Sequence, residues 1–186
     1  MHDPTEPGSV QARFAFPRQR HAPHRCIADY VRPGPSAEPD VLGLLVATVG
    51  ELVSRREQRL FEAGDYREYL HLHGLAVEVA EATASWLHAL MRRELGIAGS
   101  EQPGPRTRVR QGYRGARYSF GYPACPDLSQ QVQLFELLRP ERIGVQLTES
   151  HQMVPEQSVS AIVIHHPQAR YFHVGRARAR SRRRSR

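Results

Sequence analysis

The stretch "DYREYLHLHGLAVEVAEATASWLHALMRRE", residues 65–94, carries the clearest periodic pattern of the 186-residue chain. Apolar side chains recur at alternating steps of four and three residues, and a second apolar row runs beside the first. Two adjacent rows are typical of one long helix with a wide buried face. The rows are Tyr66, Leu70, His73, Val77, Ala80, Ala84, Leu87 and Met91, and Leu75, Val79, Ala82, Trp86 and Leu90. A third row, which includes Glu81, His88 and Arg92, is polar and is expected to face solvent.

Short apolar runs on either side of this helix predict strands. They cover residues 41–50 before it and 143–150, 158–166 and 170–174 after it. A further helix is expected over residues 128–138, capped by Asp127 and followed by Pro140. Helices and strands do not alternate as βαβ units. We therefore expect an α+β fold, an antiparallel twisted sheet with a long central helix and flanking helices.

The positive charge of the chain is concentrated at its C-terminus. The formal net charge is +7, and residues 176–186 hold seven arginines and no acid, so the remainder is formally neutral. We expect a disordered lead-in over residues 1–12, one folded domain over 13–175 and a disordered arginine-rich tail over 176–186. Such a tail holds phosphates without specificity. No aromatic residue is interleaved to stack on bases, so nucleic-acid binding is not the expected function.

Several other classes of protein are not indicated. No apolar run is long enough to span a membrane, and the first residues lack a signal-peptide core. Cys26 and Cys125 have no metal-binding spacing, which indicates a reducing, cytoplasmic compartment without a disulfide. The paired histidines at 71/73 and 165/166 point to different sides of a helix or strand, so no metal site is expected. Nucleotide-binding and nucleophile-elbow motifs are absent, and no catalytic residue is assigned.

The segment "RYSFGYPACPDL", residues 117–128, is the strongest candidate for a binding site. It presents ring faces, an arginine fork suited to a carboxylate, a glycine that permits close approach, and two prolines that restrict the backbone. A proline-rich loop packed on the core, with Arg117 in solvent, explains the same residues. The residues alone leave both interpretations open.

A longer pattern favours binding. The segments "RGARYSFGYPACPDLSQQVQLFELLRPERIGVQLTES" and "MVPEQSVSAIVIHHPQARYF" resemble the C-terminal activation domain of cobalamin-dependent methionine synthase. Upstream, "FPRQRHAPHRCIADYVRP" and the long helix are similar to the same family. The resemblance covers roughly residues 13–175.

This resemblance implies a function in methionine biosynthesis. The domain binds S-adenosylmethionine and presents its methyl group to an oxidised cobalamin, which sits on a partner module, while a flavoprotein supplies an electron. The chain is then a module or split subunit of a methyltransferase and is not catalytically complete alone. Family members usually begin further upstream, where a carboxylate meets the ligand's amino group, so the domain is expected to be shortened. The alternatives are a remnant or interaction module that keeps the fold without the ligand, and a nucleic-acid binder acting through its tail.

The resemblance also assigns roles to residues. Arg117 would pair with the ligand's carboxylate, and Glu81 would lie near its sulfonium. Tyr122 would pack beside the ligand. Gln111 stands where some members carry a glutamate. The backbone of Tyr118, Ser119, Phe120 and Gly121 would lie along the adenine. Tyr171 and Phe172 would form a second strip of ligand contacts.

Overall fold

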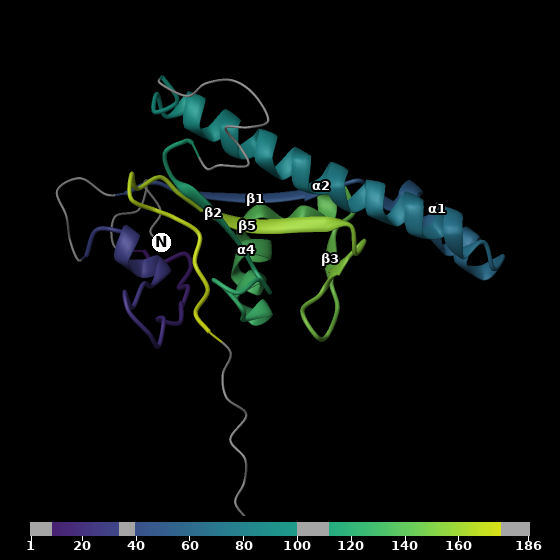
Figure 1. Cartoon of the computed structure of the whole chain (residues 1–186), viewed down its shortest axis with the longest axis horizontal. Coiled ribbons are helices and arrows are strands. Elements are labelled where there is room, and N and C mark those ends of the chain that lie inside the picture. The colour runs from purple at the N-terminus through teal and green to yellow at the C-terminus, as the bar shows by residue number, and fades with distance from the viewer. Residues whose placement is uncertain (1–8, 34–39, 100–111, 176–186) are drawn as a thin grey trace, which may run out of the picture.

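A three-stranded antiparallel sheet forms the centre of the molecule. The computed structural model describes residues 9–33, 40–99 and 112–175. The strand order is β1 (Leu42–Thr48), β5 (Ser158–Ile164) and β2 (Ala116–Ser119), so the last strand in sequence lies in the middle. Figure 1 shows the long helix crossing one face of this sheet. The α+β fold and the antiparallel sheet are confirmed.

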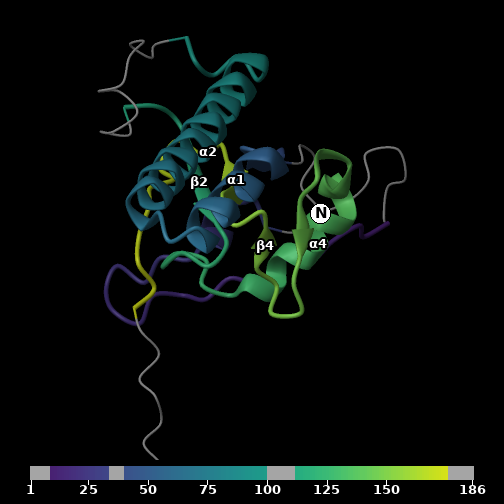
Figure 2. The same cartoon turned by 90° about the vertical axis from the view of Figure 1, so that its right-hand side faces the viewer.

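The two faces of the sheet pack against different parts of the chain, because side chains alternate along each strand. One face packs against the long helix through Leu45, Ala47, Val159, Ala161 and Val163. The other face joins the larger core, whose buried members include Ile27, Ala116, Tyr118, Leu134, Phe135, Ile162 and Ile164. In Figure 2 the long helix and the helical segment of residues 128–138 lie on opposite sides of the sheet.

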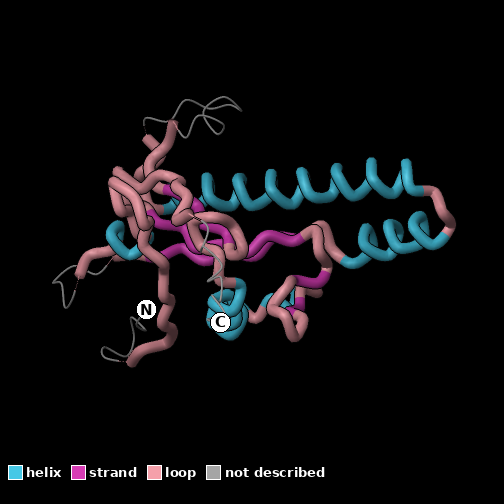
Figure 3. The backbone as a smooth tube through the Cα atoms, turned by 60° about the horizontal axis from the view of Figure 1, so that its bottom comes forward, coloured by secondary structure: helices cyan, strands magenta, loops and turns pink. Residues whose placement is uncertain are grey.

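A helical hairpin lies on the first face. It consists of α1 (Glu51–Glu62) and α2 (Tyr66–Glu94), and the short turn between them closes with Asp65 N donating to Leu60 O at 3.0 Å. Helix α2 packs on the sheet and α1 packs against α2. The helix expected over residues 65–94 is confirmed. The hairpin extends beyond the end of the sheet (Figure 3). No helix of the described residues is long and apolar enough to cross a membrane.

The buried side of α2 differs from the expected one. The fully buried residues follow a strict four-residue spacing and are Ala76, Ala80, Ala84, His88 and Arg92. Leu75, Val79 and Trp86, expected in the core, are 62%, 46% and 51% exposed. Small alanines let the helix approach the sheet closely, and this outweighs the larger apolar area of the other row. The polar row is therefore not a solvent-facing row, since His88 and Arg92 lie inside.

The opposite face is covered by a short helical layer and a hairpin. Helix α4 (Gln131–Leu138) follows the 3₁₀ turn η2 (Leu128–Gln130), and Asp127 caps η2 by accepting from Ser129 N at 2.9 Å. The cap at Asp127 was predicted, but the first turn of the expected helix is 3₁₀ and the α-helix begins at Gln131. After η3 (Pro140–Ile143), β3 (Gln146–Leu147) pairs with β4 (Met153–Val154).

Three expectations about strands need correction. The strand expected over 143–150 shrinks to the two residues of β3, because η3 occupies its start. Residues 170–174 form no strand. Their backbone groups bond singly to distant partners, for example Val174 N to Pro123 O at 3.1 Å. The segment from Arg117 is not wholly a loop, since it begins inside β2.

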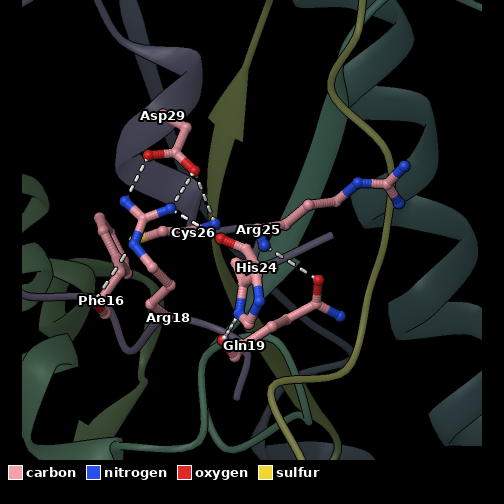
Figure 4. A network of polar contacts seen from close by, with 7 residues as sticks. All are labelled: Phe16, Arg18, Gln19, His24, Arg25, Cys26 and Asp29. Atoms are coloured by element: carbon pink, nitrogen blue, oxygen red, sulfur yellow. Dashed lines mark hydrogen bonds and ion pairs between the residues drawn. The ribbon is translucent and has the colours of Figure 1, made fainter. Parts of the chain in front are cut away.

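The N-terminal segment is held by a compact polar network (Figure 4). The Arg18 guanidinium donates to both carboxylate oxygens of Asp29, at 2.6 and 2.5 Å, and Cys26 N donates to the same carboxylate at 3.0 Å. Gln19 Nε2 donates to His173 O at 2.7 Å. The bond from Gln19 to His173 joins the N-terminal part of the described chain to its C-terminal part. Asp29 belongs to the 3₁₀ turn η1 (Ile27–Tyr30), so the network also holds this turn.

Candidate functional site

The register of β2 decides which side chains of the motif reach α2. Arg117 lies opposite Val163 and Ser119 opposite Ala161, and both partners belong to the face that packs on the helix. Gly115 starts the strand with φ at +90°, and a Cβ there would lie 2.5 Å from Ile164 O. Only glycine fits that position, so the entry to the strand is fixed by the backbone itself.

Arg117 and Glu81 form the polar centre of the site. Arg117 Nη2 donates to Glu81 Oε2 at 2.5 Å, and the two side chains are 19% and 29% exposed. Tyr122 Oη donates to Glu81 Oε1 at 3.4 Å. Burial and the neighbouring Glu81 charge raise the pKa of Tyr122, so this hydroxyl keeps its proton. Arg117 Nη1 is buried and has no hydrogen-bond partner among the described residues.

A cavity of about 220 Å³ adjoins Glu81 of this pair, and Arg117 lies behind Glu81 without being part of the lining. Ligand pockets for small molecules usually enclose roughly 300–1,000 Å³, so a ligand of that class would also extend out of the cavity. Its lining includes four of the residues assigned from the family pattern, namely Glu81, Ser119, Phe120 and Tyr122. These four come from α2, from β2 and from the turn after β2, which are distant in sequence.

The remaining assigned residues lie on the core side of the motif. Tyr118 is fully buried, its hydroxyl donates to Arg170 O at 2.9 Å, and burial raises its pKa. Its ring stacks 6.4 Å from that of Tyr171, and Phe172 is buried beside it. Gly121 has φ at +80°, and a Cβ there would lie 2.9 Å from Leu128 Cδ2. Gln111 lies outside the described residues.

A second polar cluster at the cavity was not predicted. His73 and Gln157 line it, and both contact the buried carboxylate of Glu57 on α1. The apolar pattern placed His73 in a buried row without a polar partner. Because α1 was not predicted, nothing in the sequence indicated that Glu57 would approach α2.

Buried basic groups lie on the other side of the Arg117–Glu81 pair. The Arg92 guanidinium lies 4.2 Å above the Tyr113 ring, and the His88 ring meets the same tyrosine edge-on at 5.3 Å. Burial, followed by the charge of Arg92, lowers the pKa of His88 to about 3. His88 is therefore a neutral imidazole at neutral pH. Within the described residues, no group of three or more His, Cys, Asp or Glu side chains could hold a metal ion.

Comparison with known proteins places this arrangement in one family. A family profile described as "Vitamin B12 dependent methionine synthase, activation domain" matches residues 6–181. The chain is 42% identical, over 184 aligned residues, to methionine synthase of Mycobacterium tuberculosis (strain ATCC 25618 / H37Rv), and 41% identical to that of Mycobacterium leprae (strain TN). Each match covers 94% of this chain and 15% of the relative.

A solved structure has the same fold. It is a crystal structure of the MetH reactivation domain bound to AdoHcy, with a TM-score of 0.79 and 31% sequence identity. The similarity covers 87% of this chain and 52% of the solved one. The chain thus spans only a small part of the whole enzymes that it matches.

Proposed function

This chain belongs to the family of vitamin B12-dependent methionine synthase activation domains, and from that premise we propose that it binds S-adenosylmethionine for the reactivation of an oxidised cobalamin. When bound, this ligand supplies a methyl group to the cobalamin, and a flavoprotein supplies the electron. The cobalamin would sit on a separate cobalamin-binding module or subunit. The relatives, of which this chain spans 15%, are whole methionine synthases, which supports such a partner.

The observation that carries the proposal is the unpartnered Arg117 Nη1. A buried guanidinium nitrogen without an acceptor is costly, and a ligand carboxylate would satisfy it. The other nitrogen stays with Glu81, whose carboxylate is then held beside the cavity, where it favours a cationic sulfonium. A zwitterionic amino acid with a positive sulfur matches both charges. The residues present therefore fit this ligand.

The remaining assigned residues have supporting roles in the proposal. The backbone of residues 118–121 would lie along the adenine, while Tyr171 and Phe172 hold the Tyr118 ring and so fix that backbone. Tyr122 would cover the ligand from the solvent side, since its side chain is half exposed and anchored to Glu81. We place this chain in the cytoplasm. Its two cysteines are free and buried, which is compatible with that compartment.

Calorimetric titration of the purified chain with S-adenosylmethionine tests the proposal. We expect saturable binding by the folded chain, with S-adenosylhomocysteine bound more weakly because its sulfur carries no charge. No heat of binding up to millimolar ligand, in a chain shown to be folded by circular dichroism, would contradict the proposed function.

One observation favours a second candidate, an interaction module that keeps the fold without the ligand. Leu75, Val79 and Trp86 lie along one exposed side of α2, and such rows mark contact surfaces in many proteins. The two candidates differ in the titration, since the interaction module would show no binding heat.

A further inference from the structure

The second polar cluster of the cavity contains an oriented acceptor with no partner. The side-chain nitrogen of Gln157 donates to Glu57 Oε2 and lies 3.1 Å from His73 Nδ1. The amide nitrogen is thus directed at the Glu57–His73 pair. Gln157 is only 4% exposed, and its Oε1 is buried without a hydrogen-bond partner among the described residues.

The orientation of this amide is fixed by charge. A flipped amide would place Oε1 against the Glu57 carboxylate, where two acceptors repel each other, and would leave the carboxylate without its donor. Glu57 is itself only 4% exposed, so this repulsion would be weakly screened. The nitrogen of Gln157 therefore faces Glu57, and the oxygen is left for another group.

Gln157 belongs to the cavity lining, as do Glu81 and Tyr122. His73 and Glu81 are eight residues apart on α2, which corresponds to about 12 Å along the helix. The acceptor thus lies at the opposite end of the cavity from the Arg117–Glu81 pair. A molecule that starts at Arg117 and fills the cavity would end against Gln157.

We infer that Gln157 is a ligand-contacting residue, whose Oε1 accepts a hydrogen bond from an amine or hydroxyl of the molecule bound at Arg117. Glu57 is a positioning residue, because it acts by holding the Gln157 amide. The inference rests on the proposed function and adds a specificity requirement to it: the ligand must carry a donor at the end remote from Arg117. S-Adenosylmethionine carries such donors on its base and its ribose, whereas its ammonium lies beside the carboxylate that Arg117 would bind.

Calorimetry with the Gln157→Met variant is the primary test. Methionine keeps the length of the side chain and removes the acceptor, so we expect S-adenosylmethionine to bind about three- to tenfold more weakly. Gln58→Met is the matched control, because Gln58 is the exposed neighbour of Glu57 and, within the described residues, its side chain donates to Glu62 at 2.7 Å. If Gln157→Met does not fold, Gln157→Asn, which retracts the amide by one methylene, takes its place.

The Glu57→Gln variant separates positioning from structure. It should weaken binding, and the Glu57→Gln/Gln157→Met double variant should bind no more weakly than Gln157→Met alone, because Glu57 acts only through Gln157. Additive losses would contradict the positioning role. Titration with 5′-methylthioadenosine, which lacks the amino-acid part, identifies the donor. An equal loss for both ligands assigns it to the nucleoside, as the inference requires, and a loss for S-adenosylmethionine alone would contradict the inference, because the ammonium lies at the Arg117 end.

Two results would overturn the inference, and they are distinct. If the wild type binds S-adenosylmethionine and Gln157→Met binds it equally well, the Gln157 oxygen is satisfied within the fold, by an internal water, and only this inference fails. If the folded wild type binds neither ligand, the proposed function fails and this inference fails with it.

Discussion

Only one of the two outer nitrogens of Arg117 has a partner among the described residues, and this decides what a substitution of Arg117 removes. Nη2 is paired with Glu81, while Nη1 is buried and no described residue accepts from it. The ligand therefore need not break the existing ion pair in order to bind. Glu81 stays in place beside the cavity and keeps the Arg117 guanidinium in its present position.

Arg117→Ala should weaken S-adenosylmethionine binding roughly ten- to a hundredfold, which corresponds to the loss of one charge-assisted contact of about 1.5–3 kcal/mol. Arg114→Ala is the control, because Arg114 is exposed and, among the described residues, its side chain donates to His165 O at 2.9 Å. Calorimetry on both variants measures the difference. Equal losses would show that Arg117 does not contact the ligand.

Helix α2 fits against the sheet through alanines. Ala84 is fully buried and packs with Val163 and Leu87, whereas Ala82 is exposed on the same helix. Ala84→Leu should lower the free energy of unfolding by about 1–3 kcal/mol, since the larger side chain must push the helix off the sheet. Ala82→Leu should change it by less than about 0.5 kcal/mol. Urea denaturation of the two variants, read by circular dichroism, makes the comparison, and similar losses would contradict the packing described.

The buried histidine of α2 should make stability depend on pH. His88 has a folded pKa of about 3, lowered first by burial and then by Arg92, against an ordinary value of 6.5. Between these values the unfolded chain binds a proton that the folded chain does not. The free energy of unfolding should therefore fall as the pH drops from about 6.5 toward 3, by up to about 1.4 kcal/mol per pH unit. His165, whose pKa is also lowered by burial, acts in the same direction.

Urea denaturation at pH 7, 6 and 5 measures this slope for the wild type and for His88→Gln. The variant has no titrating group at this position, so its unfolding free energy should change less over the same range. A slope as steep as that of the wild type would show that other groups cause the acid sensitivity.

The elements that the sequence predicted are those whose pattern reflects packing alone. Strand β1 and helix α2 follow apolar spacing, and the helical stretch that continues into α4 follows the cap at Asp127. Strand β2 has only four residues. Two of them face α2, where Arg117 pairs with Glu81 and Ser119 lines the cavity, so the pattern of β2 serves binding as much as packing. Helix α1 was missed because one of its two buried positions is the carboxylate of Glu57, a contact that depends on the later residue Gln157.

The candidate site was also predicted only in part from the sequence. The family pattern led to Arg117, Glu81 and Tyr122, which the fold brings into one group. It did not lead to the cluster of Glu57, His73 and Gln157. Glu57 lies on α1, His73 on α2 and Gln157 in the turn before β5. The three side chains meet only because α1 packs on α2 next to that turn. No local spacing encodes that contact.

The charge of the whole molecule resides in its last eleven residues. Removing residues 176–186 lowers the formal net charge from +7 to zero. The shortened chain should therefore not be retained on a phosphate-bearing resin. The full chain should be retained at low salt and released as the salt concentration rises, because salt weakens binding that depends on counterion release. Salt-gradient elution of the two chains measures this. Unchanged retention would place a basic patch within the remaining residues.

In β2 the requirements of binding and of folding are interleaved with a period of two: Arg117 and Ser119 face the helix, and Ala116 and Tyr118 face the core. Substitutions can separate these requirements, since Arg117 is replaceable without touching the core. An inserted or deleted residue cannot, because a shift of one position reverses the parity of the strand and exchanges the two faces. The arginine would then enter the apolar core as the tyrosine left it. Insertions and deletions in this segment should therefore prevent folding, whatever they do to ligand binding. Variants of this strand that persist should differ by substitutions alone.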